Sequence, residues 1–170
     1  MEITMNHFKL LDLEQKYDID RSELQKQYLS KQALYHPDRA STEALRTKNL
    51  DISMQLNEAY NILKDDYMRA EYLLKLLGQK FDDRTLKDAL PPAELEVLMA
   101  SHEDLEAIED LSNLQILKAS KLREKTQKTQ ELTECFLQNN ISKALEITIG
   151  LKYLTNLVKN IDFKIKHADN

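Results

Sequence analysis

The stretch "YHPDRAST", Tyr35 to Thr42, separates two long segments with helical periodicity. It contains one of the three prolines of the 170-residue chain, placed between a histidine and an aspartate. Asp20 can cap a helix before the stretch, and Ser41 or Thr42 can cap another after it. Because proline interrupts a helix and fixes its own backbone angle, the stretch predicts a turn between two helices. We expect these helices to pack as an antiparallel hairpin.

The apolar residues on each side of this turn recur at helical spacing. Before the turn, a rough stripe consists of Leu24, Tyr28, Leu34 and Tyr35. After it, one helical face carries Ile52, Leu56, Ala59, Tyr60 and Leu63. Short apolar segments flank the hairpin at residues 7–13 and 67–77, and Gly78 stands where a left-handed helix cap belongs. These features predict a unit of four helices over residues 1–78.

A second unit follows a segment without helical periodicity. Residues 79–92, "QKFDDRTLKDALPP", carry no sustained apolar stripe, and the last proline suits the first turn of a new helix. Further on, alternating spacings of three and four residues connect Ala144, Ile147, Leu151, Leu154, Val158, Ile161 and Ile165. Such a seam is the packing face of a helix in a bundle. We therefore expect a linker over 79–92 and a three-helix unit over 93–170.

Composition predicts an all-α protein. The chain has only two glycines, so the tight turns between β-strands have little of the chemistry they need. A net charge of −5 argues against binding to nucleic acid or to an anionic membrane surface. No apolar run approaches the ~20 residues of a membrane span. The N-terminal "MEITMNHFKL" resembles neither a signal nor a transit peptide, so we expect a cytoplasmic protein.

The sequence gives no sign of an enzyme or of a metal site. Cys135 is the single cysteine, and the four histidines are scattered without the spacing of metal ligands. There is no glycine-rich phosphate loop, and no nucleophile is paired with a base. We expect no cofactor and no catalysis. Taken alone, His36, Pro37 and Asp38 fit an ordinary interhelical turn better than a functional site.

Three motifs together change the interpretation of that turn. "YHPDR" at 35–39, "LNEAYNIL" at 56–63 and "MRAEYLL" at 68–74 resemble the J-domain of the DnaJ family of co-chaperones. The ending "RAEYLL" is more similar to the HscB branch, the co-chaperones of iron–sulfur cluster assembly. The resemblance implies an N-terminal J-domain, a helical hairpin with flanking short helices, joined to a C-terminal three-helix bundle that carries a cluster scaffold protein.

The resemblance also implies a contact with a heat-shock-cognate ATPase of the HscA or DnaK kind. In this family the loop formed here by His36, Pro37 and Asp38 presses on the ATPase and stimulates ATP hydrolysis. Family members add a basic face on the preceding helix, for which Arg21, Lys26 and Lys31 are the candidates here. Arg39 stands just beyond the loop. Each of these cations is equally compatible with a solvated charge of little energetic value.

The second unit carries apolar residues that one core face does not explain. In the segment 93–111 we assign one side, with Val97, Leu98, Leu105 and Ile108, to the core. Leu95 and Met99 lie on a different side among acidic residues. A line opposite the long seam consists of Ile149, Tyr153 and Leu157. Such lines either pack on another part of the chain or form a partner-binding surface.

Similarity to HscB implies which of these residues bind the scaffold, an IscU-like protein. Leu95, Met99 and Glu103 align with scaffold-binding positions of the family, and Tyr153 aligns with an aromatic contact. Glu96, Ala100 and Ala107 depart from the family pattern at other contact positions. The basic residues Lys118, Lys121, Arg123, Lys125 and Lys128 could meet nucleic acid, but an acidic helix or solvent is the better partner.

The sequence thus predicts a co-chaperone that delivers a cluster scaffold to an HscA- or DnaK-like ATPase and assists cluster transfer and protein maturation. Two alternatives stay open at this stage. One is a J-domain adaptor for an unrelated client. The other is a helical assembly protein without a chaperone role, in which the tripeptide is only a turn.

Overall fold

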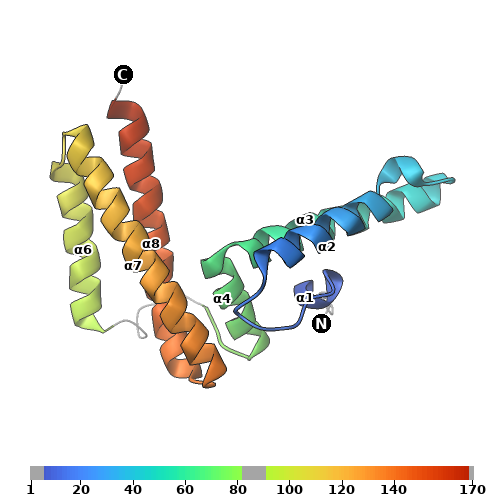
Figure 1. Ribbon diagram of the computed structural model, residues 1–170, viewed down its shortest axis with the longest axis horizontal. Helices are drawn as coiled ribbons and strands as arrows, with labels where there is room; N and C mark the ends of the chain where they lie inside the picture. Colours follow the sequence, from blue (N-terminus) through green and yellow to red (C-terminus); the bar gives the residue numbers. More distant parts are fainter. Residues whose placement is uncertain (1–5, 82–90, 169–170) are drawn as a thin grey trace. The chain divides into compact units, whose positions relative to one another are not determined.

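Every element of the described chain is a helix. The computed structural model describes residues 6–81 and 91–168 (Figure 1). The helices are α1 (His7–Leu10), α2 (Arg21–Leu34), the 3-10 helix η1 (Pro37–Arg39), α3 (Glu43–Lys64), α4 (Asp66–Leu76), α6 (Pro92–Ala107), α7 (Leu111–Leu137) and α8 (Ile141–Ala168). The all-α class is confirmed. None of these helices is long and apolar enough to cross a membrane. Internal contacts divide the chain into unit 1, residues 1–73, and unit 2, residues 74–170.

The predicted hairpin of unit 1 is confirmed in α2 and α3, which lie side by side in Figure 1. Asp20 caps α2 by accepting hydrogen bonds from two backbone N–H groups of its first turn. Thr42, rather than Ser41, caps α3. Between the helices, Tyr28 stacks on Tyr60 with ring centroids 4.2 Å apart. The side chains of both helices thus hold the hairpin in a fixed register.

The core of unit 1 lies where α1, α3 and α4 meet the loop before α2. Its largest fully buried side chains are Phe8, Leu11, Tyr17, Leu24, Leu56 and Leu63. His7, at the start of α1, stacks on Tyr72 of α4 with ring centroids 4.4 Å apart. Its backbone N–H donates to the Tyr72 hydroxyl at 3.0 Å. The short α1 is therefore held by tertiary packing, since a single turn has little stability of its own.

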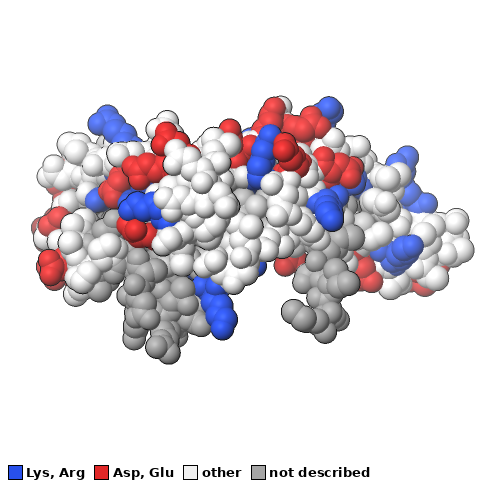
Figure 2. Space-filling view, turned by 90° about the horizontal axis from the view of Figure 1, so that it is seen from below, with Lys and Arg blue, Asp and Glu red and all other residues white. Residues whose placement is uncertain are grey.

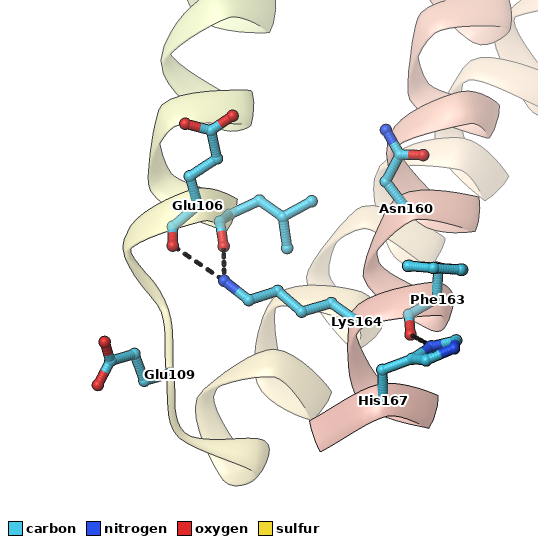
Figure 3. A pocket seen from close by; sticks show the side chains of 7 residues that line it. Glu106, Glu109, Asn160, Phe163, Lys164 and His167 are labelled. Atoms are coloured by element: carbon cyan, nitrogen blue, oxygen red, sulfur yellow. Dashed lines mark hydrogen bonds between the residues drawn. The ribbon is translucent and has the colours of Figure 1, made fainter. Parts of the chain in front are cut away.

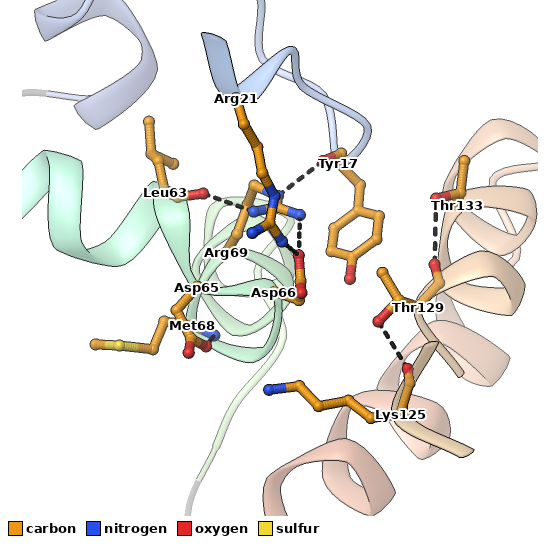
Figure 4. A network of polar contacts seen from close by, with 10 residues as sticks. All are labelled: Tyr17, Arg21, Leu63, Asp65, Asp66, Met68, Arg69, Lys125, Thr129 and Thr133. Atoms are coloured by element: carbon orange, nitrogen blue, oxygen red, sulfur yellow. Dashed lines mark hydrogen bonds and ion pairs between the residues drawn. The ribbon is translucent and has the colours of Figure 1, made fainter. Parts of the chain in front are cut away.

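A buried guanidinium joins three segments at the base of the hairpin (Figure 4). Arg69 of α4 is only 4% exposed. It donates to the Tyr17 carbonyl at 2.8 Å and to the Leu63 carbonyl at 2.6 Å. A third hydrogen bond of 2.7 Å reaches Asp66, which also accepts one of 2.6 Å from Arg21. The guanidinium thereby ties the loop before α2, the end of α3 and the start of α4 together.

The environment of Asp66 sets its ionisation. Burial alone would raise the pKa of this carboxyl, but hydrogen bonds from Arg69 and Arg21 outweigh burial and lower the pKa. A folded-state pKa below the unfolded value means that the ionised carboxylate stabilises unit 1. That contribution is present above the unfolded pKa and is lost as the pH falls through the folded-state pKa.

The end of α4 confirms the role expected for Gly78. Its φ of +82° is left-handed, which glycine adopts without a steric penalty. The Gly78 N–H donates to the Lys75 carbonyl, and the Gln79 N–H donates to the Leu74 carbonyl. This pair of hydrogen bonds is the Schellman motif, which satisfies the last carbonyls of a helix.

Unit 2 is built around α8, which packs on both α7 and α6. Six residues of the predicted α8 seam are buried and Ile165 is half-buried, so the seam is confirmed. At one end of the bundle, Leu105 of α6 and Leu114 of α7 form a buried cluster with Leu157 and Ile161 of α8. Lys164 extends this contact by donating to the carbonyls of Leu105 and Glu106 at 2.7 and 2.9 Å.

The structure contradicts one expectation about the faces of the bundle and decides between two alternatives for another. Val97 was assigned to the core, but its side chain is 59% exposed. The packing described for α6 comes from its C-terminal end, where Leu105 belongs to the cluster and Ile108, just after the helix, packs against it, and Val97 lies well before that end. For the line on α8, the alternative of packing within the chain is confirmed at Ile149 and Leu157, which are 0% and 1% exposed. Packing on two helices buries more of α8 than one seam accounts for.

We predict that replacing Arg69 with Met destabilises unit 1 by about 3 to 5 kcal/mol, as expected when one partner of a buried charged network is removed. The change leaves the carbonyls of Tyr17 and Leu63 without their donor and Asp66 with one cation fewer. Denaturant-dependent hydrogen exchange of α3 amides in the full chain measures the effect. Arg46→Met, at an exposed position of α3, is the matched control and should change stability by less than about 0.5 kcal/mol. Equal stability of the two variants would contradict the role of Arg69.

A second prediction concerns pH. Burial lowers the pKa of His7 below its ordinary value of 6.5, and the opposing effect of Glu58 is smaller. A histidine with a lowered folded-state pKa must be neutral in the folded protein, so stability is lost as the pH falls below the unfolded pKa. We expect an NMR titration of His7 to show a midpoint below that of an unfolded peptide covering residues 5–9. A midpoint equal to or above that of the peptide would contradict the packing of α1.

Candidate functional site

The His36-Pro37-Asp38 turn, here called the tip, is an ordered element between α2 and α3. His36 is the N-cap of η1, and its Nδ1 accepts the Asp38 N–H at 3.3 Å. Pro37 occupies the first helical position, where its missing N–H costs no hydrogen bond. The Arg39 N–H donates to the His36 carbonyl at 3.0 Å, and the Ala40 N–H donates to the Pro37 carbonyl at 3.1 Å. The tip therefore keeps its shape through its own hydrogen bonds.

The two ionisable side chains of the tip remain accessible. The side chains of His36 and Asp38 are 58% and 77% exposed, and His36 Nδ1 lies 3.6 Å from an oxygen of the Asp38 carboxylate. Because Nδ1 accepts a backbone N–H, the neutral ring carries its proton on Nε2. The tip thus offers an N–H donor next to a carboxylate acceptor. This pair suits recognition of polar groups on another protein.

The predicted cations around the tip all have partners within unit 1. Lys26 pairs with Glu23 at 3.2 Å, and Lys31 pairs with Asp12 at 2.8 Å. Arg39 donates to the Ala33 carbonyl at 2.9 Å, so it closes the end of α2.

Arg21, which was expected to extend the basic face, pairs with Asp66 at 2.6 Å instead. Figure 2 shows blue and red side chains interspersed on the face it displays. A count of cations in the sequence missed these pairings. The one between Lys26 and Glu23 could have been found from its i, i+3 spacing.

The predicted scaffold-binding residues lie on two helices of unit 2 that pack together. On α6, Met99 is 60% exposed and Glu103 is also exposed. On α8, Tyr153 is half-buried between the buried Ile149 and Leu157. The side chain of Leu95 lies outside the described part of the structure. Met99 is an apolar side chain in water beside an acidic one, as the sequence predicts.

Basic residues of α7 also have partners in unit 2. Lys118 pairs with Asp162 of α8 at 2.6 Å. Lys121 pairs with Glu124 at 3.1 Å and donates to Ser101 of α6 at 3.3 Å. Two members of the predicted basic cluster therefore contribute to packing of the bundle.

No metal site appears in the described ranges, which contain no group of three or more histidine, cysteine, aspartate or glutamate side chains that could hold an ion. Burial raises the pKa of the Cys135 thiol, and its acidic neighbours add to this effect against Lys143. A raised pKa favours the thiol over the thiolate, which is the form that binds metals and acts as a nucleophile.

Comparison with known proteins identifies both units. The family model for the DnaJ domain matches residues 6–72. The family model described as the HSCB C-terminal oligomerisation domain matches residues 90–162. A helical hairpin with an exposed His-Pro-Asp tip, matched by the first model, defines a J-domain.

Relatives and a solved structure match along most of the chain. The chain is 31% identical over 151 residues to "J-type co-chaperone JAC1, mitochondrial" of Saccharomyces cerevisiae, covering 84% of this chain and 77% of that one. It is 28% identical over 163 residues to "Iron-sulfur cluster co-chaperone protein HscB" of Homo sapiens, covering 95% and 69%. The crystal structure of human HscB superposes with a TM-score of 0.88 and 25% identity, covering 96% and 84%. The chain belongs to the HscB family of J-type co-chaperones.

Proposed function

We propose that the chain binds an IscU-like iron–sulfur scaffold protein through unit 2 and presents it to an HscA- or DnaK-like ATPase through the tip. The tip stimulates ATP hydrolysis by the ATPase, and the chain itself catalyses no reaction and carries no cofactor. The observation that supports this proposal is the hydrogen-bonded tip, which exposes His36 and Asp38 in one fixed geometry. Membership of the HscB family favours this function over an adaptor for an unrelated client.

The order within the tip gives it a thermodynamic advantage as a docking element. A flexible loop loses conformational entropy when it binds, which weakens binding. Pro37 and the His36 cap already restrict the conformation of the free tip, so it loses less entropy on binding. Asp38 can then accept a charge-assisted hydrogen bond from a partner arginine, while His36 Nε2–H donates beside it.

The basic residues have a smaller part in this proposal. Lys26 and Lys31 would have to exchange Glu23 and Asp12 for carboxylates of the ATPase. An exchange between two partly exposed ion pairs gains little free energy. Arg39 keeps its structural bond to Ala33. We therefore assign most of the specific contact to His36, Pro37 and Asp38, with these cations assisting approach.

For the scaffold we propose the surface formed by Leu95, Met99 and Glu103 of α6 and Tyr153 of α8. Exposed apolar side chains flanked by acid are typical of binding surfaces with a dry centre and a polar rim. Carrying both sites on one chain raises the concentration of scaffold at the ATPase without a covalent step. The predicted division into 1–78, 79–92 and 93–170, and the cytoplasmic location, remain part of the proposal.

We predict that His36→Gln abolishes stimulation of the ATPase, a loss on the order of tenfold or more, corresponding to ~1.4 kcal/mol or more of contact free energy. The measurement is single-turnover ATP hydrolysis by the chaperone with the full chain added. His36→Asn is the matched control for capping, because asparagine is a strong N-cap and keeps an acceptor close to the position of Nδ1.

We expect His36→Asn to keep the order of the tip and still to lose stimulation, because it lacks the outward Nε2–H. Full stimulation by His36→Asn would show that the histidine acts only as a cap. Full stimulation by His36→Gln would contradict the proposal that the tip stimulates the ATPase.

A separate prediction tests the scaffold surface. Replacing Leu95, Met99 and Tyr153 together with Ala should weaken scaffold binding by on the order of a hundredfold or more, because truncating apolar anchors that the partner covers costs ~1 to 2 kcal/mol each. Isothermal titration calorimetry measures the affinity. Ile116→Ala is the control, since Ile116 is 67% exposed on α7 and outside the proposed surface. Unchanged affinity of the triple variant would place the scaffold site elsewhere, while stimulation of the ATPase without scaffold should persist.

A further inference from the structure

An open groove lies at one end of unit 2, between the end of α6 and the last turns of α8 (Figure 3). Its volume of ≈ 820 Å³ is within the range of sites that hold a small ligand or a short peptide segment. Leu105, Glu106 and Glu109 line it on the α6 side. Phe163 and His167 line it on the α8 side. We call this feature the C-terminal groove.

One wall of the C-terminal groove is aromatic and unusually exposed. Phe163 is 65% exposed although it is a large apolar side chain. Its ring stacks on His167 with centroids 4.1 Å apart. His167 Nδ1 lies 2.7 Å from the Phe163 carbonyl, which can only accept, so Nδ1 carries the proton. The neutral ring of His167 therefore presents Nε2 as an acceptor.

The opposite wall is acidic and lacks a compensating cation. The one lysine in the groove, Lys164, donates to the backbone carbonyls of Leu105 and Glu106. This ammonium closes the C-terminal end of α6, where the last carbonyls lack partners within the helix. Neither carboxylate of Glu106 or Glu109 forms an ion pair within the described chain. Their charge adds to the negative end of the α6 dipole.

A groove with an aromatic wall on α8 and two carboxylates at its α6 rim is a suitable site for a basic segment (Figure 3). Lysine and arginine bury their methylene groups on apolar surface while their charged ends stay near acid. A guanidinium or ammonium is also attracted to the face of a phenyl ring. An acidic or purely apolar side chain would instead meet the charge of Glu106 and Glu109 without compensation.

Both walls of the C-terminal groove continue the proposed scaffold surface. Glu106 lies one turn beyond Glu103 on α6. Asn160, which also lines the groove, lies two turns beyond Tyr153 on α8. A partner seated on Met99 and Tyr153 would therefore extend into the groove without crossing the buried core.

We propose that the C-terminal groove holds a short basic segment of the iron–sulfur scaffold protein. A lysine or arginine side chain of that segment lies on the ring of Phe163, and the carboxylates of Glu106 and Glu109 at the α6 rim attract the basic segment. This inference rests on the proposed function and adds to it a charged contact that fixes the orientation of the scaffold. His167 holds the ring of Phe163 in place and offers its Nε2 as a further acceptor.

The test is calorimetry of the full chain with the purified scaffold protein of the same organism, at low and high salt, about 0.05 M and 0.5 M. E106Q/E109Q removes both charges and keeps the shape, and we expect about tenfold weaker binding at low salt, as for two partly exposed charge contacts. The loss should shrink at high salt. F163A should weaken binding several-fold at both salt concentrations.

The matched control is E131Q/E134Q, which removes two carboxylates at the same i, i+3 spacing near the other end of α7. It should bind the scaffold as the unchanged protein does. Helicity and thermal unfolding check each variant, and F163L, which keeps an apolar side chain but loses the ring, replaces F163A should F163A fail to fold.

Several results would overturn the inference. The proposed basic side chain in the groove would be contradicted by normal binding of E106Q/E109Q or by normal binding of the Phe163 variant. An equal loss of affinity in E131Q/E134Q would contradict it too. An effect of E106Q/E109Q on ATPase binding or self-association, in place of scaffold binding, would show a different occupant.

Different binding results would contradict the proposed function itself. If the unchanged protein does not bind the scaffold, both proposals fall. If the Leu95, Met99 and Tyr153 variant binds weakly while the groove variants bind normally, the proposed function stands and only the groove is wrong.

Discussion

The buried guanidinium of Arg69 is the interaction on which the geometry of unit 1 depends. It joins the loop before α2, the end of α3 and the start of α4 through Tyr17, Leu63 and Asp66. Through Asp66 it also reaches Arg21 at the start of α2. An arginine suits this position because its planar group donates in several directions at once and stays charged. Burying it is tolerated because its hydrogen bonds are satisfied together.

The position of the tip depends on the fixed base of the hairpin. The tip is joined to the base by two helices whose side chains interlock, as in the hydrogen bonds of Gln32 to Ser53 and Asn57. The order of η1 then depends on His36, which caps it, and on Pro37, which begins it. One histidine thus has both a structural contact through Nδ1 and an accessible donor at Nε2. Under the proposed function, this division lets the tip contact another protein while the cap of η1 stays in place.

Much of this architecture could be predicted from the sequence. Caps at Asp20 and Thr42, the left-handed Gly78 and the α8 seam all follow from local rules that act within a few residues. The partners of Lys31 and Arg69 could not be predicted, because Asp12 and Tyr17 lie far away along the chain.

The exposure of Val97 was missed for a related reason. Periodicity shows which side chains share a face but not how far along a helix its neighbour extends. The C-terminal groove was missed because nothing in the sequence distinguishes Phe163 and Lys164 from other surface positions. The groove forms only through the packing of α6 on α8.

The central claim is that one chain must carry both the tip and the scaffold surface. The most direct measurement compares scaffold-dependent ATPase stimulation by the unchanged chain with that by an equal mixture of two full-length variants. One variant is His36→Gln and the other carries the three alanines at Leu95, Met99 and Tyr153, so each retains one site. Because linkage on one chain supplies the effective concentration, the mixture should stimulate no more than its separate components. Stimulation by the mixture equal to that of the unchanged chain would contradict the account.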